Sequence, residues 1–173
     1  MMAASRGAGV DWESIARGML DYVTEFDVPA SVSVDVNQSN VFSGRRVRNI
    51  VISDDNTTIA NYAFSGTPSL SNIQFPSSVT KMNNNVFQSS GIVIITLPET
   101  ITTYGSGVFY NCRFLQKVII DAATPPTIGA NMFLNCTALT GIYVPDASVA
   151  AYKAASGWSA YADRIKPLSE LGE

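Results

Sequence analysis

Two observations predict a β-rich solenoid for this chain: a phenylalanine recurs at a nearly constant interval, and a short alternating segment follows it at a nearly constant distance. The phenylalanines are Phe42, Phe64, Phe87, Phe109 and Phe133, separated by 22, 23, 22 and 24 residues. A period of this length indicates a stack of small supersecondary units, none of which buries its hydrophobic face alone. We therefore expect about five repeats of 22–24 residues.

The alternating segments predict one short strand in each repeat. They occupy residues 73–75, 95–97, 118–120 and 142–144. Alternation with a period of two residues is typical of a strand with one buried face. Pro76, Pro98 and Pro145 follow three of these segments and should end the strands, because proline donates no ladder hydrogen bond. Stacking of the repeats then makes the strands parallel.

The two ends of the sequence predict caps for the stack. Asp11 is a candidate helix N-cap, and the apolar residues Trp12, Ile15, Met19 and Val23 follow it at helical spacing. We assign residues 1–27 to an N-terminal tail and capping helix, with a partner-docking helix as the alternative. Residues 28–145 form the repeats. Residues 146–173 form a C-terminal cap, so the chain is expected to be a complete unit.

The C-terminal cap is predicted from a second helical pattern. Trp158, Tyr161 and Ile165 follow one another at steps of three and four residues. This spacing places them on one face of a helical segment, as an apolar lid over the last repeat needs.

Several positions of each repeat agree with a known family. The agreeing stretches are Ala63-Phe64, Phe109-Tyr110-Asn111-Cys112, Phe133-Leu134-Asn135-Cys136-Thr137-Ala138-Leu139, Val79-Thr80 and Ile128-Gly129. From residue 28 to 146 the sequence resembles the BspA-type leucine-rich repeat. It departs from that pattern at Thr67 and Ser90, which replace the cysteine, and at residues 121–124, which replace a proline turn. The resemblance implies a noncatalytic binding or assembly protein.

Composition argues against several classes of partner. Charged residues make up 14 % of the chain, against roughly 25 % in an average soluble domain, and the net charge is −3. No nucleic-acid partner is expected, because phosphate binding needs clustered Lys and Arg. Arg45, Arg46 and Arg48 form the only basic cluster, which suits a solvated repeat edge or a ligand contact. The longest apolar run, residues 92–97, is too short for membrane insertion, and residues 1–10 lack the apolar core of a signal peptide.

Catalysis is not expected, because the chain contains no histidine. This removes the commonest general base, the common nucleophile pairs and the commonest zinc ligand. Cys112 and Cys136 lie 24 residues apart, at the same position of neighbouring repeats. Buried unreactive thiols are the main interpretation, and a disulfide between repeats is the alternative. We expect no catalytic residue, no cofactor and no metal site.

The candidate interaction surface is the outward face of the predicted sheet. The residues assigned to it are Val51, Gln74, Ile94, Thr96, Ile119 and Tyr143. Exposed apolar patches often mark interfaces, although single exposed apolar residues are ordinary on a sheet face. Val51, Ile94, Ile119 and Tyr143 are the apolar, partly aromatic members.

The resemblance implies either bacterial adhesins or phage virion proteins. We expect a virion structural or adhesion component of a tail, baseplate or head fibre. Its partner would be a virion or cell-surface protein or a host glycan, and it would form a homo-oligomer, such as a trimer. The alternatives are a bacterial cell-surface adhesin and an intracellular protein-interaction module.

Overall fold

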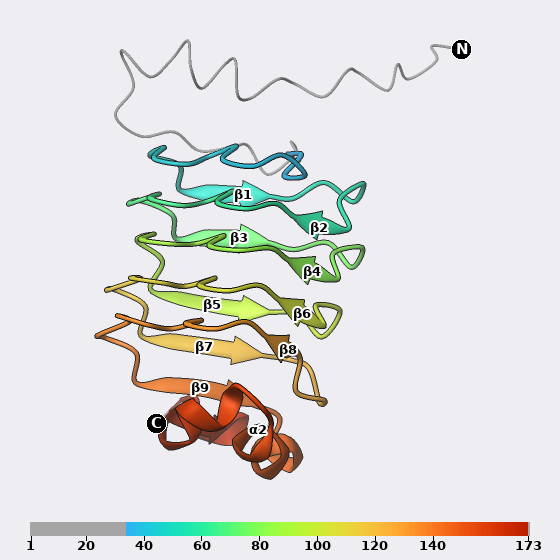
Figure 1. Cartoon of the computed structure of the whole chain (residues 1–173), viewed down its shortest axis with the longest axis vertical. Coiled ribbons are helices and arrows are strands. Elements are labelled where there is room, and N and C mark those ends of the chain that lie inside the picture. Colours follow the sequence, from blue (N-terminus) through green and yellow to red (C-terminus); the bar gives the residue numbers. More distant parts are fainter. Residues whose placement is uncertain (1–33, 173) are drawn as a thin grey trace.

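The computed structural model describes residues 34–172, and within them each repeat makes one turn of an elongated stack (Figure 1). Val34 begins the described stack through a parallel bridge to Ile52. The expected N-terminal capping helix of residues 1–27 lies outside the described residues. The predicted β-rich solenoid is confirmed.

One strand of each repeat contributes to the principal face of the stack. These strands are β1 (Asn49–Val51), β3 (Asn72–Gln74), β5 (Ile94–Leu97), β7 (Lys117–Ile120) and β9 (Gly141–Val144), followed by β10 (Ile165–Pro167). All neighbouring pairs are parallel, in the orders β1-β3 and β10-β9-β7-β5. Alternate residues of these strands enter the interior, as the alternating pattern predicted.

The structure adds a second parallel sheet to the one strand expected in each repeat. Its strands are β2 (Thr58–Ile59), β4 (Lys81–Met82), β6 (Thr103–Tyr104) and β8 (Thr127–Ile128). These strands have only two residues, so the sequence offers too little alternation to distinguish them from a loop. The interior therefore lies between two sheets and the turn that carries the phenylalanine.

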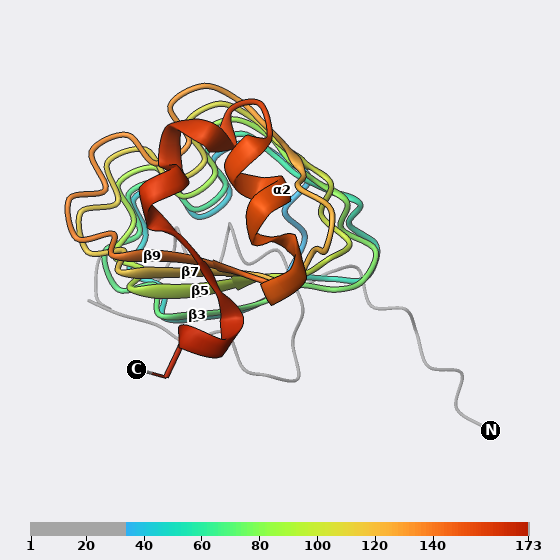
Figure 2. The ribbon, with the colours of Figure 1, turned by 90° about the horizontal axis from the view of Figure 1, so that it is seen from below.

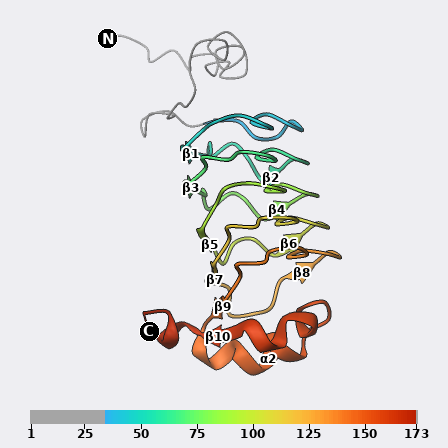
Figure 3. The same ribbon diagram turned by 90° about the vertical axis from the view of Figure 1, so that its left-hand side faces the viewer.

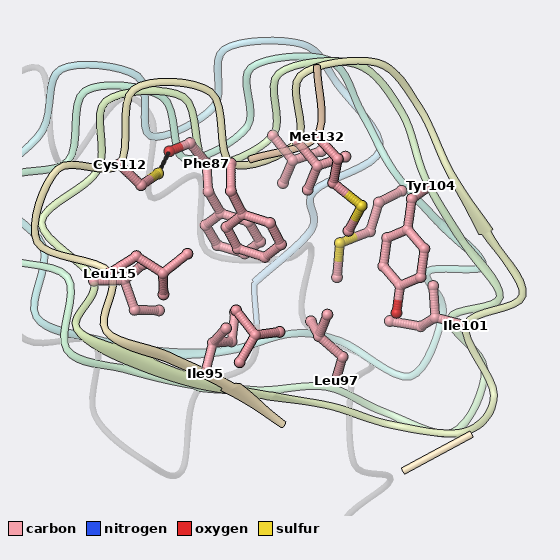
Figure 4. Close-up of a cluster of buried hydrophobic side chains, with 14 of the residues drawn as sticks. Phe87, Ile95, Leu97, Ile101, Tyr104, Cys112, Leu115 and Met132 are labelled. Carbon is pink, nitrogen blue, oxygen red and sulfur yellow. Dashed lines mark hydrogen bonds between the residues drawn. The ribbon is translucent and has the colours of Figure 1, made fainter. Parts of the chain in front are cut away.

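The five phenylalanines form a continuous row of stacked rings inside the solenoid. Successive ring centroids are 5.7, 5.3, 5.2 and 5.5 Å apart, with interplanar angles between 4° and 15°. Figure 4 shows part of this row among aliphatic side chains of the two sheets. The row ends on the C-terminal cap, where Tyr161 meets the Phe133 ring edge-on at 5.2 Å.

The turn around each phenylalanine holds two residues in the left-handed region. One lies two positions before the phenylalanine and the other two positions after it. The first column is Asn40, Tyr62, Asn85, Gly107 and Asn131, and the second is Gly44, Gly66, Ser89, Asn111 and Asn135. Asn and Gly tolerate positive φ best, which explains their frequency here. In both columns, every backbone N–H before the last repeat donates to a carbonyl of the next repeat, as from Asn111 to Leu134 at 2.8 Å.

Cys112 and Cys136 are free and buried. Each thiol donates to the carbonyl of the preceding repeat's phenylalanine, from Cys112 to Phe87 and from Cys136 to Phe109, both at 2.9 Å. Interaction with the neighbouring Cys112 thiol, followed by burial, raises the pKa of the Cys136 thiol. At the same position Thr67 donates to the carbonyl of Phe64 at 2.8 Å, so the departure from cysteine preserves a bond to a phenylalanine carbonyl.

The C-terminal cap lies across the last repeat (Figure 3). It contains η1 (Asp146–Ser148), α2 (Val149–Ala154), η2 (Trp158–Arg164) and η3 (Leu168–Glu170). Ser148, Tyr152 and Trp158 donate to the carbonyls of Ala123, Ala122 and Pro126, each at 2.7 Å. The stretch that departs from the repeat pattern is therefore where the cap docks.

The principal face is divided between β3 and β5, since no ladder joins these two strands. The connection from the phenylalanine to the next buried aliphatic residue runs from Phe64 to Leu70, but only from Phe87 to Ile92. Among the described repeats, this is the one place where a repeat has a shorter connection than the repeat before it. Gly91 lies so close to the preceding repeat that a Cβ there would collide with the carbonyl oxygen of Pro68.

Candidate functional site

The outward row that the sequence predicted exists, but in two parts. Val51 pairs with Gln74, while Thr96 pairs with Ile119, which in turn pairs with Tyr143. The division between β3 and β5 separates the two parts. At this division lies a small groove of about 150 Å³, and the residues that line it include Asn72, Ile73 and Ile94.

Exposure is uneven along this face. Gln74 and Thr96 are exposed, and Ile94 keeps 48 % of its surface accessible. Val51 and Ile119 are half-buried. The apolar part of the face is therefore concentrated on β5 and β7.

The expectation that Tyr143 is exposed is wrong, because only 3 % of its surface is accessible. Its side chain does leave the interior, since the ring lies over Gly141, where a Cβ would collide with it. The C-terminal segment then returns along this face (Figure 2) and places Lys166 beside Tyr143. Lys117 fastens the segment by donating to the carbonyl of Leu171 at 3.0 Å, with its ammonium 5.6 Å from the Tyr143 ring centroid.

Two exposed apolar residues that sequence reasoning did not select lie at the entrance to the same strands. Val93, directly before β5, is 41 % exposed, and Phe114, three residues before β7, is 65 % exposed. Val93 accepts hydrogen bonds from the N–H groups of Gln116 and Lys117, at 2.8 and 3.4 Å, so the two entrances are neighbours. Phe114 carried a usable signal, since no other repeat has a large apolar residue at the matching position, where Arg46, Ser69, Gly91 and Ala138 stand.

The described residues show no cluster suited to binding a metal ion. Within residues 34–172, no three Cys, Asp or Glu side chains gather closely enough to hold an ion. The Tyr104 hydroxyl is buried without a hydrogen-bond partner, and burial raises its pKa well above the usual range. In the close-up this hydroxyl lies beside Ile101 (Figure 4). No helix in this part of the chain has the length and apolar character needed to span a bilayer.

A second recess lies between the last repeat and the cap. It has a volume of about 500 Å³, and its walls come from residues 131–137 and from the η2 segment. Sequence reasoning did not anticipate it, because it depends on where the cap docks. Its lining mixes polar side chains, such as Asp163 and Arg164, with apolar ones, such as Leu134.

A family model agrees with this geometry. Residues 37–155 match the BspA type leucine-rich repeat region, in six copies. The chain belongs to the BspA-type leucine-rich repeat family. Members of this family are generally noncatalytic, and leucine-rich repeat domains commonly mediate protein–protein contacts. A search of curated protein sequences finds no match.

Solved structures of other leucine-rich repeat proteins resemble this BspA-type chain. One is a leucine-rich repeat protein from Bacteroides ovatus, 22 % identical, with a TM-score of 0.58; the match covers 84 % of this chain and 43 % of that one. Another is a leucine rich cell surface protein from Faecalibacterium prausnitzii, 26 % identical, with a TM-score of 0.61; the match covers 78 % of this chain and 36 % of that one. The chain thus spans less than half the length of either relative.

Proposed function

We propose that this BspA-type repeat chain is a noncatalytic binding module whose contact surface lies on the outward face of β5 and β7. The surface, called here the apolar strip, consists of Val93, Ile94, Phe114 and Ile119. The observation that carries the proposal is the exposure of its first three members, at 41, 48 and 65 %. An exposed apolar patch on a soluble protein commonly marks an interface.

The position of the cap supports the choice of β5 and β7. The C-terminal segment covers β9, and β10 extends the sheet beyond it, so Tyr143 is not accessible to a partner. Pro167, at the end of β10, donates no hydrogen bond, which disfavours addition of another strand at that end. A partner is therefore expected on the face of the sheet rather than along this edge.

A protein partner fits the apolar strip better than a glycan does. The strip consists of three half-exposed or exposed aliphatic side chains and one phenylalanine. Apolar and aromatic side chains enrich the cores of protein interfaces, where charged residues are depleted. Lys117, which pairs with Ile94 in the sheet, already donates a hydrogen bond to the carbonyl of Leu171.

The setting of this binding module is a further proposal. The F. prausnitzii relative is a cell surface protein, which supports a bacterial cell-surface adhesin. The expectation of a phage virion component stays a proposal beside it, as does an N-terminal helix in residues 1–27 that caps the stack or docks to a partner. Mass spectrometry of purified phage particles and antibody labelling of intact cells would distinguish the two settings.

Site-specific photocrosslinking in the producing cells tests the apolar strip. A photoreactive residue at Thr96, exposed beside the strip, should capture a discrete protein, and Ile94→Asp should abolish that product. The same probe at Asn84, exposed on a loop away from this face, is the matched control. No protein product at Thr96, a product that survives Ile94→Asp, or a glycan product only would contradict the proposal.

Self-association through the apolar strip can be measured directly. If the proposed homotrimer uses this surface, sedimentation should show a trimer that Ile94→Asp converts to a monomer. Gln74→Asp, on the outward face of β3, should leave the sedimentation unchanged. A monomeric unmodified protein would contradict the oligomer but not the binding module.

A further inference from the structure

Two backbone N–H groups of the last repeat have no following repeat whose carbonyls could accept their hydrogen bonds. In the repeats before it, the two left-handed residues of the phenylalanine turn donate along the stack, from Gly107 to Ala130 at 2.9 Å and from Asn111 to Leu134 at 2.8 Å. Asn131 and Asn135 occupy the same positions in the last repeat, with φ values of 61° and 65°. Because the backbone conformation is the same, their N–H groups point along the stack toward the cap.

The cap satisfies only the central donor of this turn. The N–H of Phe133 donates to the Tyr161 hydroxyl at 3.4 Å. Within residues 34–172, the N–H groups of Asn131 and Asn135 have no acceptor. On the other side of the cap, by contrast, three polar side chains bond the carbonyls of residues 122, 123 and 126.

These two donors line the recess of about 500 Å³ between the last repeat and η2, called here the terminal groove. The cap contributes Ala160, Tyr161, Asp163 and Arg164 to its wall. Arg164 is exposed, and its guanidinium makes no hydrogen bond or ion pair with any described residue. The groove thus joins two backbone N–H donors and an arginine without partners in one open space.

We propose that the terminal groove binds a carboxylate group of a ligand. Backbone N–H groups that converge on a concavity bind anions, and an arginine forms charge-assisted hydrogen bonds with a carboxylate. Asp163 balances Arg164, so the wall carries no net charge, which favours a monoanion over a phosphate dianion. Acidic peptides and acidic sugars present the same carboxylate chemistry. This site is separate from the apolar strip and does not depend on it.

Amide NMR of the full chain tests the site with defined probes. Titration with N-acetylglycine should move the amide proton resonances of Asn131 and Asn135 downfield. Those of Gly107 and Asn111, which are already bonded inside the stack, should stay in place. N-acetylglycinamide has the same shape without the charge and should cause no shift. Equal shifts with the amide, or equal or tighter binding of inorganic phosphate, would overturn the assignment.

Two exposed substitutions examine the groove without disturbing the core. Arg164→Gln should weaken N-acetylglycine binding about tenfold, the scale of one lost hydrogen bond to a charged group. Ala160→Phe should block the groove sterically, while Ala151→Phe, on the exposed face of α2, should leave binding unchanged. Unaltered binding in either groove variant would overturn the proposal.

Two further probes identify the source of the carboxylate. Tighter binding of an acetylated aspartate peptide than of N-acetylglycine supports an acidic peptide ligand. Tighter binding of glucuronate supports an acidic sugar. Absence of shifts at Asn131 and Asn135 with all three acids would show that these donors remain solvated and would refute the site.

Discussion

Replacement of Phe87 by alanine should be among the most damaging changes in the chain, because Phe87 lies in the middle of the stacked row. Its side chain is fully buried, and its ring stacks on Phe64 at 5.3 Å and on Phe109 at 5.2 Å. Truncation of a buried phenylalanine to alanine costs about 3–5 kcal/mol. Phe87→Leu keeps most of the apolar volume but removes two ring pairs, each worth about 0.5–1.5 kcal/mol, so it should cost about 1–3 kcal/mol.

Urea unfolding followed by circular dichroism measures both variants. Phe114→Ala is the matched control, because Phe114 is 65 % exposed and should lose less than about 0.5 kcal/mol. The reasoning would be refuted if Phe87→Ala lost under about 1 kcal/mol, or if the two alanine variants lost the same free energy of unfolding. A Phe87→Leu variant as stable as the unmodified chain would show that ring stacking contributes nothing beyond burial.

Three further predictions concern buried polar groups. Tyr104→Phe should leave stability unchanged or raise it, because the Tyr104 hydroxyl is buried without a partner. Tyr152→Phe should instead cost about 1 kcal/mol, through loss of the hydrogen bond to the carbonyl of Ala122. Equal losses of unfolding free energy in urea would contradict this. Burial raises the pKa of both tyrosines, so above about pH 10 the unfolded chain ionises while the folded chain does not. The contribution of these two tyrosines to stability should therefore be constant below that pH and fall above it, by up to about 1.4 kcal/mol per pH unit for each tyrosine. The variant with both Tyr104→Phe and Tyr152→Phe should show a shallower fall. The thiols of Cys112 and Cys136 should resist a thiol reagent in the folded protein and react on unfolding. Both are buried, and burial contributes to the raised pKa of Cys136. Rapid reaction without unfolding would disprove their inaccessibility.

The repeat positions were predictable because they depend on contacts between residues at equivalent positions of adjacent repeats. A phenylalanine that recurs at a fixed interval must stack on its counterpart, so the interval alone located the row from Phe42 to Phe133. The direction in which Thr96, Ile119 and Tyr143 leave the sheet followed from alternation in the same way. The two-residue strands β2, β4, β6 and β8 escaped this reasoning, because alternation over two residues carries no usable period.

The candidate surface was only partly predictable, because exposure depends on segments distant in the sequence. Tyr143 leaves the interior as expected, but the chain after Ile165 returns to cover it, and no local pattern around Tyr143 announces this. Phe114 had a local signal, since it is the one large apolar residue at its position among the five repeats. The one-residue change in connection length before Ile92 was also visible, although its effect on the pairing of β3 with β5 was not.

The sequence by itself determined the family, the stacking axis, the identity of the interior row and the side of the sheet to which each strand residue points. These properties follow from short-range periodicity, since each repeat meets only its neighbours. Only the tertiary structure decided which outward residues remain accessible and where the stack stops bonding to itself. The cap docks through single hydrogen bonds at Ala122, Ala123 and Pro126 and through Lys117, and it leaves Asn131 and Asn135 facing a groove. Those contacts occur once in the chain and have no period, so they became visible only in three dimensions.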